Sequence, residues 1–262
     1  MSVNLFQLKS YFNYWLDAVD EHSLHSPFLF DFYTNLLKKK RSNPTLVSIE
    51  IYRKSLEQDH RTIHVTDLGA GSVKLKTSKR KVSDIARVST TPKKFSSLYS
   101  RIIGHYQCRH IIELGTSLGV NTLYLANAHK NTQVVTFEGS SAIASIANKG
   151  FQEDNGRHIR MIEGNIDKTL PSYLTASPPI DFAYIDANHR LEPTLRYFEG
   201  LVTKMHSKSI LVMDDIHYSK EMEVAWQTVQ RNKAVTITID LYRCGLVFFD
   251  TSLTKQNVVL QF

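Results

Sequence analysis

The sequence is poor in cysteine and has no long apolar run. Cys108 and Cys244 are the only cysteines in 262 residues, and they lack CxxC spacing. Neither a disulfide framework nor a zinc site follows, so we expect two buried, reduced thiols. Polar side chains interrupt the N-terminal segment from Gln7 to Asp17, which therefore lacks the core of a signal peptide and any ~20-residue membrane span. These absences predict a soluble, cytoplasmic protein with no membrane partner.

Charge is distributed unevenly along the chain. Residues 1–100 contain 16 Lys and Arg against 9 Asp and Glu, and this surplus of 7 equals the whole formal net charge of +7. The runs Lys38–Arg41 and Lys74–Lys81 supply much of it. Such runs are usually solvated surface, and a nucleic-acid or other polyanionic partner is the less favoured interpretation.

The stretch from Arg109 to His129 organises the chain. An apolar run that ends at Leu114 predicts a strand, Gly115 to Gly119 can turn sharply, and the spacing after Val120 predicts a helix. This junction points backbone N–H groups and a positive helix end at a ligand. The next strand-like run ends in Glu138, 23 residues after Gly115, where an acid can accept hydrogen bonds from both ribose hydroxyls. The G-x-x-x-G spacing favours S-adenosylmethionine over a dinucleotide.

A second glycine-rich stretch, Thr66 to Ser72, also follows a strand-like run. No amphipathic helix and no acid-terminated strand follow it at the right distance, so we interpret Gly69 to Gly71 as a turn in an N-terminal appendage.

Five segments carry a family resemblance in their order and spacing. They are Glu113–Gly119 (ELGTSLG), Glu138, Gly164–Leu170 (GNIDKTL), Asp181–His189 (DFAYIDANH) and Ile210–His217 (ILVMDDIH). In these motifs the sequence resembles class I S-adenosylmethionine-dependent methyltransferases. Within that superfamily it is most similar to the catechol O-methyltransferase-like group and its bacterial small-molecule relatives. The resemblance covers roughly Ser89 to Asp250.

The expected fold is α/β. Strand-like and helical segments alternate from Arg109 to Asp214, which predicts a parallel sheet with helices on both faces. The resemblance implies a Rossmann-like, mostly parallel, seven-stranded sheet with an antiparallel last strand, which matches a predicted hairpin of Val235–Leu241 with Gly245–Phe249. We expect a methyltransferase domain over residues 89–262 and a helical cap over residues 1–88.

Two helices are expected in that cap. Apolar residues recur at helical spacing from Leu5 to Val19, and we expect this aromatic-rich stripe to face the core. Ser26 and Pro27 read as an N-cap and first helical residue of a second helix.

The resemblance also implies a set of cofactor-binding residues. Glu138 would bind the ribose, Asn165 with Ile166 would lie at the adenine edge, and the glycine loop would lie under the methionine portion. The whole set comprises Glu113, Gly115, Thr116, Ser117, Gly119, Glu138, Gly139, Asn165, Ile166 and Asp186.

Three acids should meet at the carboxyl ends of two strands. Asp186 ends one strand, and Asp214 with Asp215 ends the next, so their mutual repulsion invites a divalent cation such as Mg²⁺. In the resembled group, aligned positions hold such a metal. His189 and His217, each three residues after an acid, are the candidate bases, and Asp186 completes the predicted catalytic set. The alternative is that one or two of these acids cap helices or hold the cofactor's amine, and that the histidines are structural.

The favoured function is methyl transfer from S-adenosylmethionine to a hydroxyl of a small molecule. One rival is a methyltransferase for RNA or another polyanion, against which the Tyr184–His189 segment lacks the Asp/Asn-Pro-Pro-aromatic run of base-amine methylases. Another is a non-catalytic module that keeps the cofactor site, and a dinucleotide-dependent oxidoreductase is disfavoured by the glycine spacing. A homodimer is compatible with the sequence.

Overall fold

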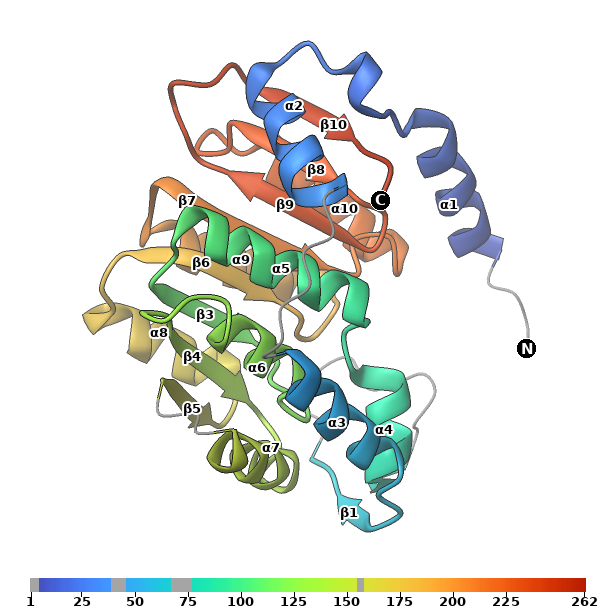
Figure 1. Ribbon diagram of the computed structural model, residues 1–262, viewed down its shortest axis with the longest axis vertical. Coiled ribbons are helices and arrows are strands. Elements are labelled where there is room, and N and C mark those ends of the chain that lie inside the picture. Colours follow the sequence, from blue (N-terminus) through green and yellow to red (C-terminus); the bar gives the residue numbers. More distant parts are fainter. Residues whose placement is uncertain (1–4, 39–45, 67–76, 155–157) are drawn as a thin grey trace. The chain divides into compact units, whose positions relative to one another are not determined.

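The structure is a computed structural model that describes residues 5–38, 46–66, 77–154 and 158–262 (Figure 1). The chain forms two compact units: unit 1 comprises Met1–Lys40 and Pro179–Phe262, and unit 2 is the continuous stretch Arg41–Pro178. The second glycine-rich stretch and both basic runs lie wholly or partly outside the described residues. Within the described ranges, no helix combines the length and apolarity that crossing a membrane requires.

Unit 2 contains three parallel strands and most of the predicted alternation. Strand β3 pairs with β4, and β4 pairs with β5, both in parallel register. Helices α6 and α8 pack on β4, and α7 packs on β4 and β5. The elements are α3 (Leu46–Glu57), β1 (Thr62–His64), β2 (Lys79–Lys81), α4 (Val82–Ser89), α5 (Lys93–Tyr106), β3 (His110–Leu114), α6 (Val120–Ala126), β4 (Gln133–Glu138), α7 (Ser141–Glu153), β5 (Ile159–Glu163) and α8 (Ile166–Ala176).

Helices α3 and α4, which the sequence did not predict, share a core with the glycine-loop region. Ile49 of α3 and Ile85 of α4 belong to the same buried cluster as Leu123 of α6 and Phe151 of α7. A domain boundary at residue 88 remains a prediction.

Unit 1 combines the N-terminal helices with the last five strands. Strand β6 is parallel to β7, β9 is antiparallel to β7 and to β8, and β10 is parallel to β8. The predicted hairpin is therefore confirmed, whereas β10 was not predicted. The elements are α1 (Leu5–Asp17), η1 (Glu21–Ser23), α2 (Pro27–Phe32), η2 (Tyr33–Lys38), β6 (Ile180–Ile185), α9 (Leu191–Val202), β7 (Met205–Asp214), α10 (Lys220–Arg231), β8 (Ile237–Asp240), β9 (Cys244–Phe248) and β10 (Gln256–Val259).

Helix α2 begins as the sequence predicts. The Ser26 side chain accepts a hydrogen bond from the backbone N–H of Leu29, and Pro27 occupies the first helical position. The rings of Phe28 and Phe32 both make T-shaped contacts with Phe248 on β9, so aromatic packing holds this helix against the sheet.

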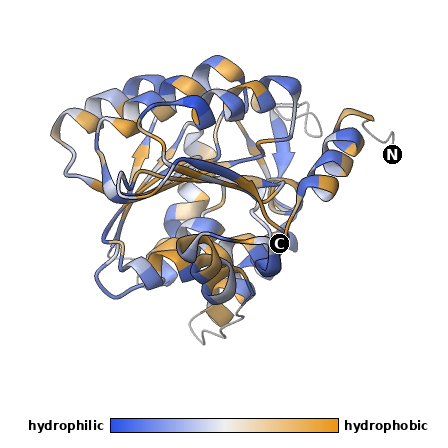
Figure 2. Cartoon of the chain, turned by 90° about the horizontal axis from the view of Figure 1, so that it is seen from above, coloured by the Kyte–Doolittle hydropathy of each residue, from blue (hydrophilic) through white to orange (hydrophobic). Residues whose placement is uncertain are grey.

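Helix α1 also forms as predicted, but the expected burial of its apolar stripe is wrong. Five large apolar side chains of α1 are exposed: Leu5, Leu8, Phe12, Trp15 and Leu16. Figure 2 shows apolar residues on this helix beside the N-terminus as well as along the strands. Hydrogen bonds hold α1 instead, since Tyr14 donates to the carbonyl of Leu260 and Tyr242 donates to that of Gln7.

Candidate active-site residues

The glycine loop of unit 2 has the sharp turn that its sequence predicts. Gly115, Ser117 and Gly119 have positive φ values of 95°, 49° and 80°. A Cβ on Gly119 would lie 2.6 Å from Cε1 of Phe151, so only glycine fits there. The N–H groups of Gly115 and Thr116 donate to the carbonyl of Phe137 at 3.0 and 3.1 Å, which ties the loop to the end of β4.

Glu138 lies at that end of β4 and anchors two neighbouring turns. Its Oε2 accepts from the N–H of Ser117 and its Oε1 from the N–H of Ser140, both at 2.9 Å. Each carboxylate oxygen has two lone pairs, so further donors can still bind. The side chain is half-buried, as a ribose contact requires, and Gly139 follows it in the turn before α7.

Glu113 has a different environment from the other predicted cofactor residues. It is fully buried on β3 and accepts hydrogen bonds from Asn121, Thr122 and Thr136. These bonds tie β3 to α6 and β4, so Glu113 shapes the loop from beneath.

Three buried polar atoms around this loop lack a hydrogen-bond partner among the described residues. They are the side-chain oxygens of Ser117, Asn121 and Ser140. Buried polar groups are rarely left unpaired, so these atoms are suited to a polar ligand. Asn165 caps α8 through its Oδ1, which accepts from the N–H of Asp167 at 2.9 Å, and Ile166 is the first residue of that helix.

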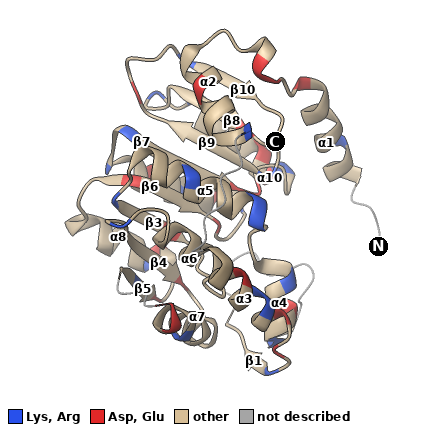
Figure 3. Cartoon of the chain, in the orientation of Figure 1, with Lys and Arg blue, Asp and Glu red and all other residues tan. Residues whose placement is uncertain are grey.

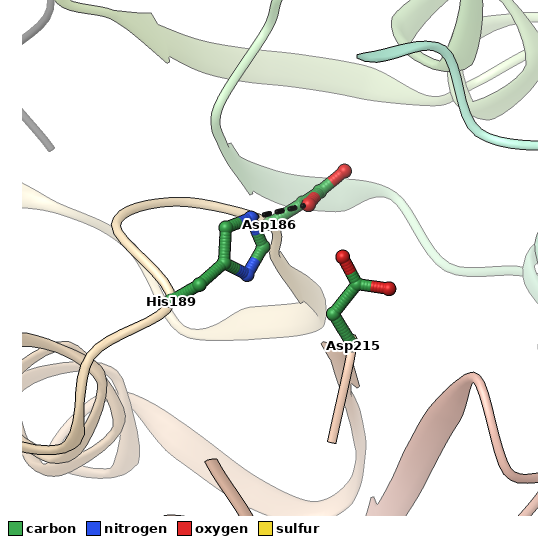
Figure 4. A group of neighbouring side chains, drawn as sticks. All are labelled: Asp186, His189 and Asp215. Carbon is green, nitrogen blue, oxygen red and sulfur yellow. Dashed lines mark ion pairs between the residues drawn. The ribbon is translucent and has the colours of Figure 1, made fainter. Parts of the chain in front are cut away.

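Unit 1 brings Asp186, His189 and Asp215 together (Figure 4). Asp186 follows β6 and Asp215 follows β7, which are adjacent parallel strands. One ligand atom from each of the three side chains lies within 4.8 Å of the others, and Nε2 of His189 is 3.3 Å from Oδ1 of Asp186. This donor set of two carboxylates and one imidazole suits a divalent cation.

The predicted third acid, Asp214, is not part of this group and is fully buried. Nη2 of Arg243 is 3.0 Å from Oδ2 of Asp214 and 3.8 Å from Oδ1 of Asp215. Burial, aided by the charges of Asp186 and Asp215, raises the pKa of Asp214 well above its usual value. Its Oδ1 has no hydrogen-bond partner among the described residues. Sequence reasoning missed Arg243, because it lies far from these acids along the chain.

The proton between Asp186 and His189 is held on the histidine. Burial alone would lower the pKa of His189, but the hydrogen bond and charge of Asp186 outweigh it and raise the pKa to about 9. Burial would likewise raise the pKa of Asp186, yet His189 holds it below its usual value. Tyr184 also donates to Asp186, at 3.1 Å. An imidazole with this pKa is protonated at neutral pH, which counts against a free general base.

His217, the other candidate base, has both ring nitrogens engaged by carboxylates. Nδ1 lies 3.0 Å from Glu223 on α10, and Nε2 lies 2.8 Å from Asp240 on β8. Burial opposes its positive charge, but the Asp240 and Glu223 contacts together raise the pKa of His217. The ring also stacks on Tyr242, so the geometry favours the structural alternative.

The backbone around Asp186, His189 and Asp215 has an unusual conformation. Asn188, His189 and Asp215 have positive φ values of 69°, 49° and 52°. Non-glycine residues rarely adopt this region, and such strain tends to concentrate at functional sites. The fold therefore holds these side chains in place against a local backbone cost.

Comparison with known proteins shows what the chain is similar to. Residues 112–216 match the family described as a methyltransferase domain. A solved O-methyltransferase from Bacillus cereus in complex with S-adenosylhomocysteine superimposes with a TM-score of 0.57 at 15% identity, covering 79% of this chain and 92% of that one. The chain thus has the Rossmann-like fold of solved methyltransferases that its motifs predict, and residues 112–216 are similar to a methyltransferase domain.

The more particular relatives are O-methyltransferases. A catechol O-methyltransferase of Niastella koreensis is 26% identical over 49% of this chain and 58% of its own length. A putative O-methyltransferase from Klebsiella pneumoniae has a TM-score of 0.59 at 13% identity, covering 85% of this chain and 97% of that one. The chain spans about half the length of the curated relatives it matches.

Proposed function

We propose that the protein transfers a methyl group from S-adenosylmethionine to a hydroxyl of a small molecule. One observation carries the step from fold to chemistry: two carboxylates and an imidazole converge after adjacent strands within 4.8 Å of one another. The names of solved relatives that state bound S-adenosylhomocysteine support the cofactor, and the curated relatives' names support a catechol-like acceptor. A cytoplasmic location remains a prediction from the sequence.

The residues of unit 2 fit this cofactor. Glu138 would accept the ribose hydroxyls on its remaining lone pairs, and Asn165 with Ile166 would meet the adenine. The backbone of Gly115 to Gly119, together with Gly139, would border the methionine portion, where the unpaired oxygens of Ser117, Asn121 and Ser140 offer polar contacts. When bound, S-adenosylmethionine supplies an electrophilic methyl group on a sulfonium.

The residues of unit 1 fit a divalent cation. Asp186, His189 and Asp215 would hold it, with the buried Asp214 paired to Arg243 nearby. Such a cation lowers the pKa of a hydroxyl that binds to it. His189 must give up its proton before it binds a cation or accepts a proton from the acceptor, and Asp186 and Asp215 orient it for either role.

The cofactor half of the proposal is tested with Glu138→Ala. Charge-assisted hydrogen bonds are worth ~1.5–3 kcal/mol, so the dissociation constant for S-adenosylhomocysteine should rise roughly 10- to 150-fold by calorimetry. Glu163→Ala is the matched control, because Glu163 ends β5 in direct register with Glu138 and is exposed. Equal affinities of the two variants would refute the placement.

The cation half is tested by chelation with catechol as the first acceptor. Chelation should abolish turnover and added Mg²⁺ should restore it, while the affinity for S-adenosylhomocysteine stays unchanged. If His189 acts as a general base without a cation, chelation will matter little and loss of His189 will cost on the order of 10²–10⁴ in rate. Activity that survives both chelation and the loss of His189 would refute cation activation and general-base catalysis by His189.

A further inference from the structure

The backbone of the β8–β9 hairpin fixes Arg243 beside the acids at the end of β7. Cys244, the next residue, pairs with Asp214 in antiparallel register, and the N–H of Ile216 donates to the carbonyl of Arg243 at 3.3 Å. The hairpin therefore delivers the Arg243 side chain to the strand end that carries Asp214 and Asp215.

The guanidinium of Arg243 lies close to both acids. Nη2 is 3.0 Å from Oδ2 of Asp214 and 3.8 Å from Oδ1 of Asp215. Burial works against its charge, but the charges of Asp214 and Asp215 outweigh burial and raise the pKa of Arg243. A guanidinium stays protonated in proteins, so Arg243 is a fixed positive charge beside the cluster of acids.

The two acids that end β7 have different surroundings. Asp215 is 28% exposed and joins Asp186 and His189 in the group of possible ligands, whereas Asp214 is fully buried and outside that group. We propose that Arg243 is a positioning residue that keeps Asp214 from ligating a cation and lowers the affinity of the group for a free divalent cation. This inference rests on the cation half of the proposed function.

Charge gives the direction of the effect. The three acids carry up to three negative charges, and Arg243 offsets one of them whether or not a cation is bound. A like charge at such short range changes a binding equilibrium by about 10-fold or more. Arg243 also disfavours the proton on His189 that a cation has to displace, but a divalent cation bears two charges against the proton's one. Removing Arg243 should therefore tighten cation binding.

A purely structural role for Arg243 leads to the opposite outcome. If Arg243 only held the acids in place, its loss would disorder the site and weaken cation binding. If Arg243 competes with the cation, its loss frees Asp214 as a further carboxylate ligand and strengthens binding. The wild-type site then binds a free cation loosely, and its occupancy follows the concentration of that cation around the protein.

Titration of the metal-free full chain with Mn²⁺ alone tests this inference, with unbound Mn²⁺ measured by electron paramagnetic resonance. Arg243→Gln should lower the dissociation constant for Mn²⁺ about 10-fold or more. Arg243→Lys keeps the charge and should bind Mn²⁺ as the wild type does. The matched control is Arg231→Gln, which removes the same charge from an exposed residue at the end of α10, a helix with charges of both signs (Figure 3). Unchanged circular dichroism would establish that the variants fold.

Asp214→Asn reports on the released ligand. It should weaken Mn²⁺ binding more in the Arg243→Gln background than in the wild type, because only there can Asp214 reach the cation. Equal effects in the two backgrounds contradict the release of Asp214. If the wild type binds Mn²⁺ and Arg243→Gln binds it equally or more weakly, the inference is overturned and the cation site stands. If neither binds Mn²⁺, the cation half of the proposed function is wrong together with this inference.

Discussion

Two buried carboxylates, one in each unit, have opposite environments. Glu113 of unit 2 accepts hydrogen bonds from Asn121, Thr122 and Thr136. Asp214 of unit 1 has one oxygen paired with Arg243 and the other without a partner among the described residues. Both side chains are fully buried. Several hydrogen-bond donors stabilise the ionised form of a buried carboxylate. Neighbouring acids destabilise that form unless a positive charge lies close to it.

The two environments indicate different roles, a structural one for Glu113 and a chemical one for the acids of unit 1. Hydrogen bonds within unit 2 fix the glycine loop in shape before any ligand binds. In unit 1, the acids rely on Arg243 and on the proton of His189 for neutralisation. A cation that replaced this proton would relieve the same repulsion.

The largest effect should come from Asp215→Asn, which removes one carboxylate from the proposed cation group. If the cation stabilises the transition state by several kcal/mol, turnover should fall by about 10²–10⁴-fold. Asp181→Asn is the control, because Asp181 lies at the start of β6 and also contacts a histidine, His206, at 3.0 Å. Similar rates for the two variants would place the chemistry elsewhere.

Replacing each of the two buried acids by its isosteric amide tests whether their environments differ. Glu113→Gln replaces one of two acceptor oxygens by an NH₂ donor that faces other donors, so the free energy of unfolding should fall by about 2–3 kcal/mol. Asp214→Asn removes a charge that burial and two neighbouring acids disfavour, and Arg243 keeps its contact with Asp215, so the loss in metal-free protein should be smaller than that of Glu113→Gln. Urea unfolding measures both, and equal losses would contradict the distinction.

The pH dependence of stability tests the charge states of His189 and Asp186 in unit 1. The pKa of His189 is about 9 in the folded chain, against roughly 6.5 when unfolded. Its contribution is therefore complete below pH ~6.5 and is lost as the pH rises through about 9, which amounts to roughly 3 kcal/mol. The pKa of Asp186 is lowered, so the stability that its ionised carboxylate contributes is lost as the pH falls. Thermal unfolding of metal-free protein should show the alkaline loss, and His189→Gln should flatten it.

The smallest effect should come from His217→Gln. Its imidazole bridges Glu223 and Asp240, so the free energy of unfolding should fall by about 1–2 kcal/mol. The pH profile of kcat should keep its shape, because both ring nitrogens are engaged by carboxylates. A shifted profile would return His217 to the list of bases.

Sequence reasoning recovered the elements whose signals are local. The alternation from β3 to β7, the hairpin and the Ser26 cap all follow from periodicity and turn chemistry within short windows. Helix α1 was predicted as a helix for the same reason. Its apolar stripe was assigned to the core because periodicity identifies a face but not what covers it.

Some contacts of the predicted site residues could be anticipated from the sequence, and others involve residues far away along the chain. The two strand ends carrying Asp186 and Asp215 follow from the order of strands, so their meeting could be anticipated. The neutralising Arg243 could not, because nothing near it in sequence signals an acid. Likewise, the spacing that suggested His217 as a base says nothing of Asp240, which occupies its second nitrogen.

The joining of the two chain ends bears on how the protein is synthesised. Val19 accepts a hydrogen bond from the N–H of Gln261 and donates one to the carbonyl of Val259, so unit 1 closes only when both segments exist. Ribosomes add about 5–20 residues per second, which separates the emergence of these segments by roughly 10–50 s. Unit 2 is continuous and can fold during that interval. Through the same interval the apolar side chains of α1 are exposed to chaperones and to other nascent chains.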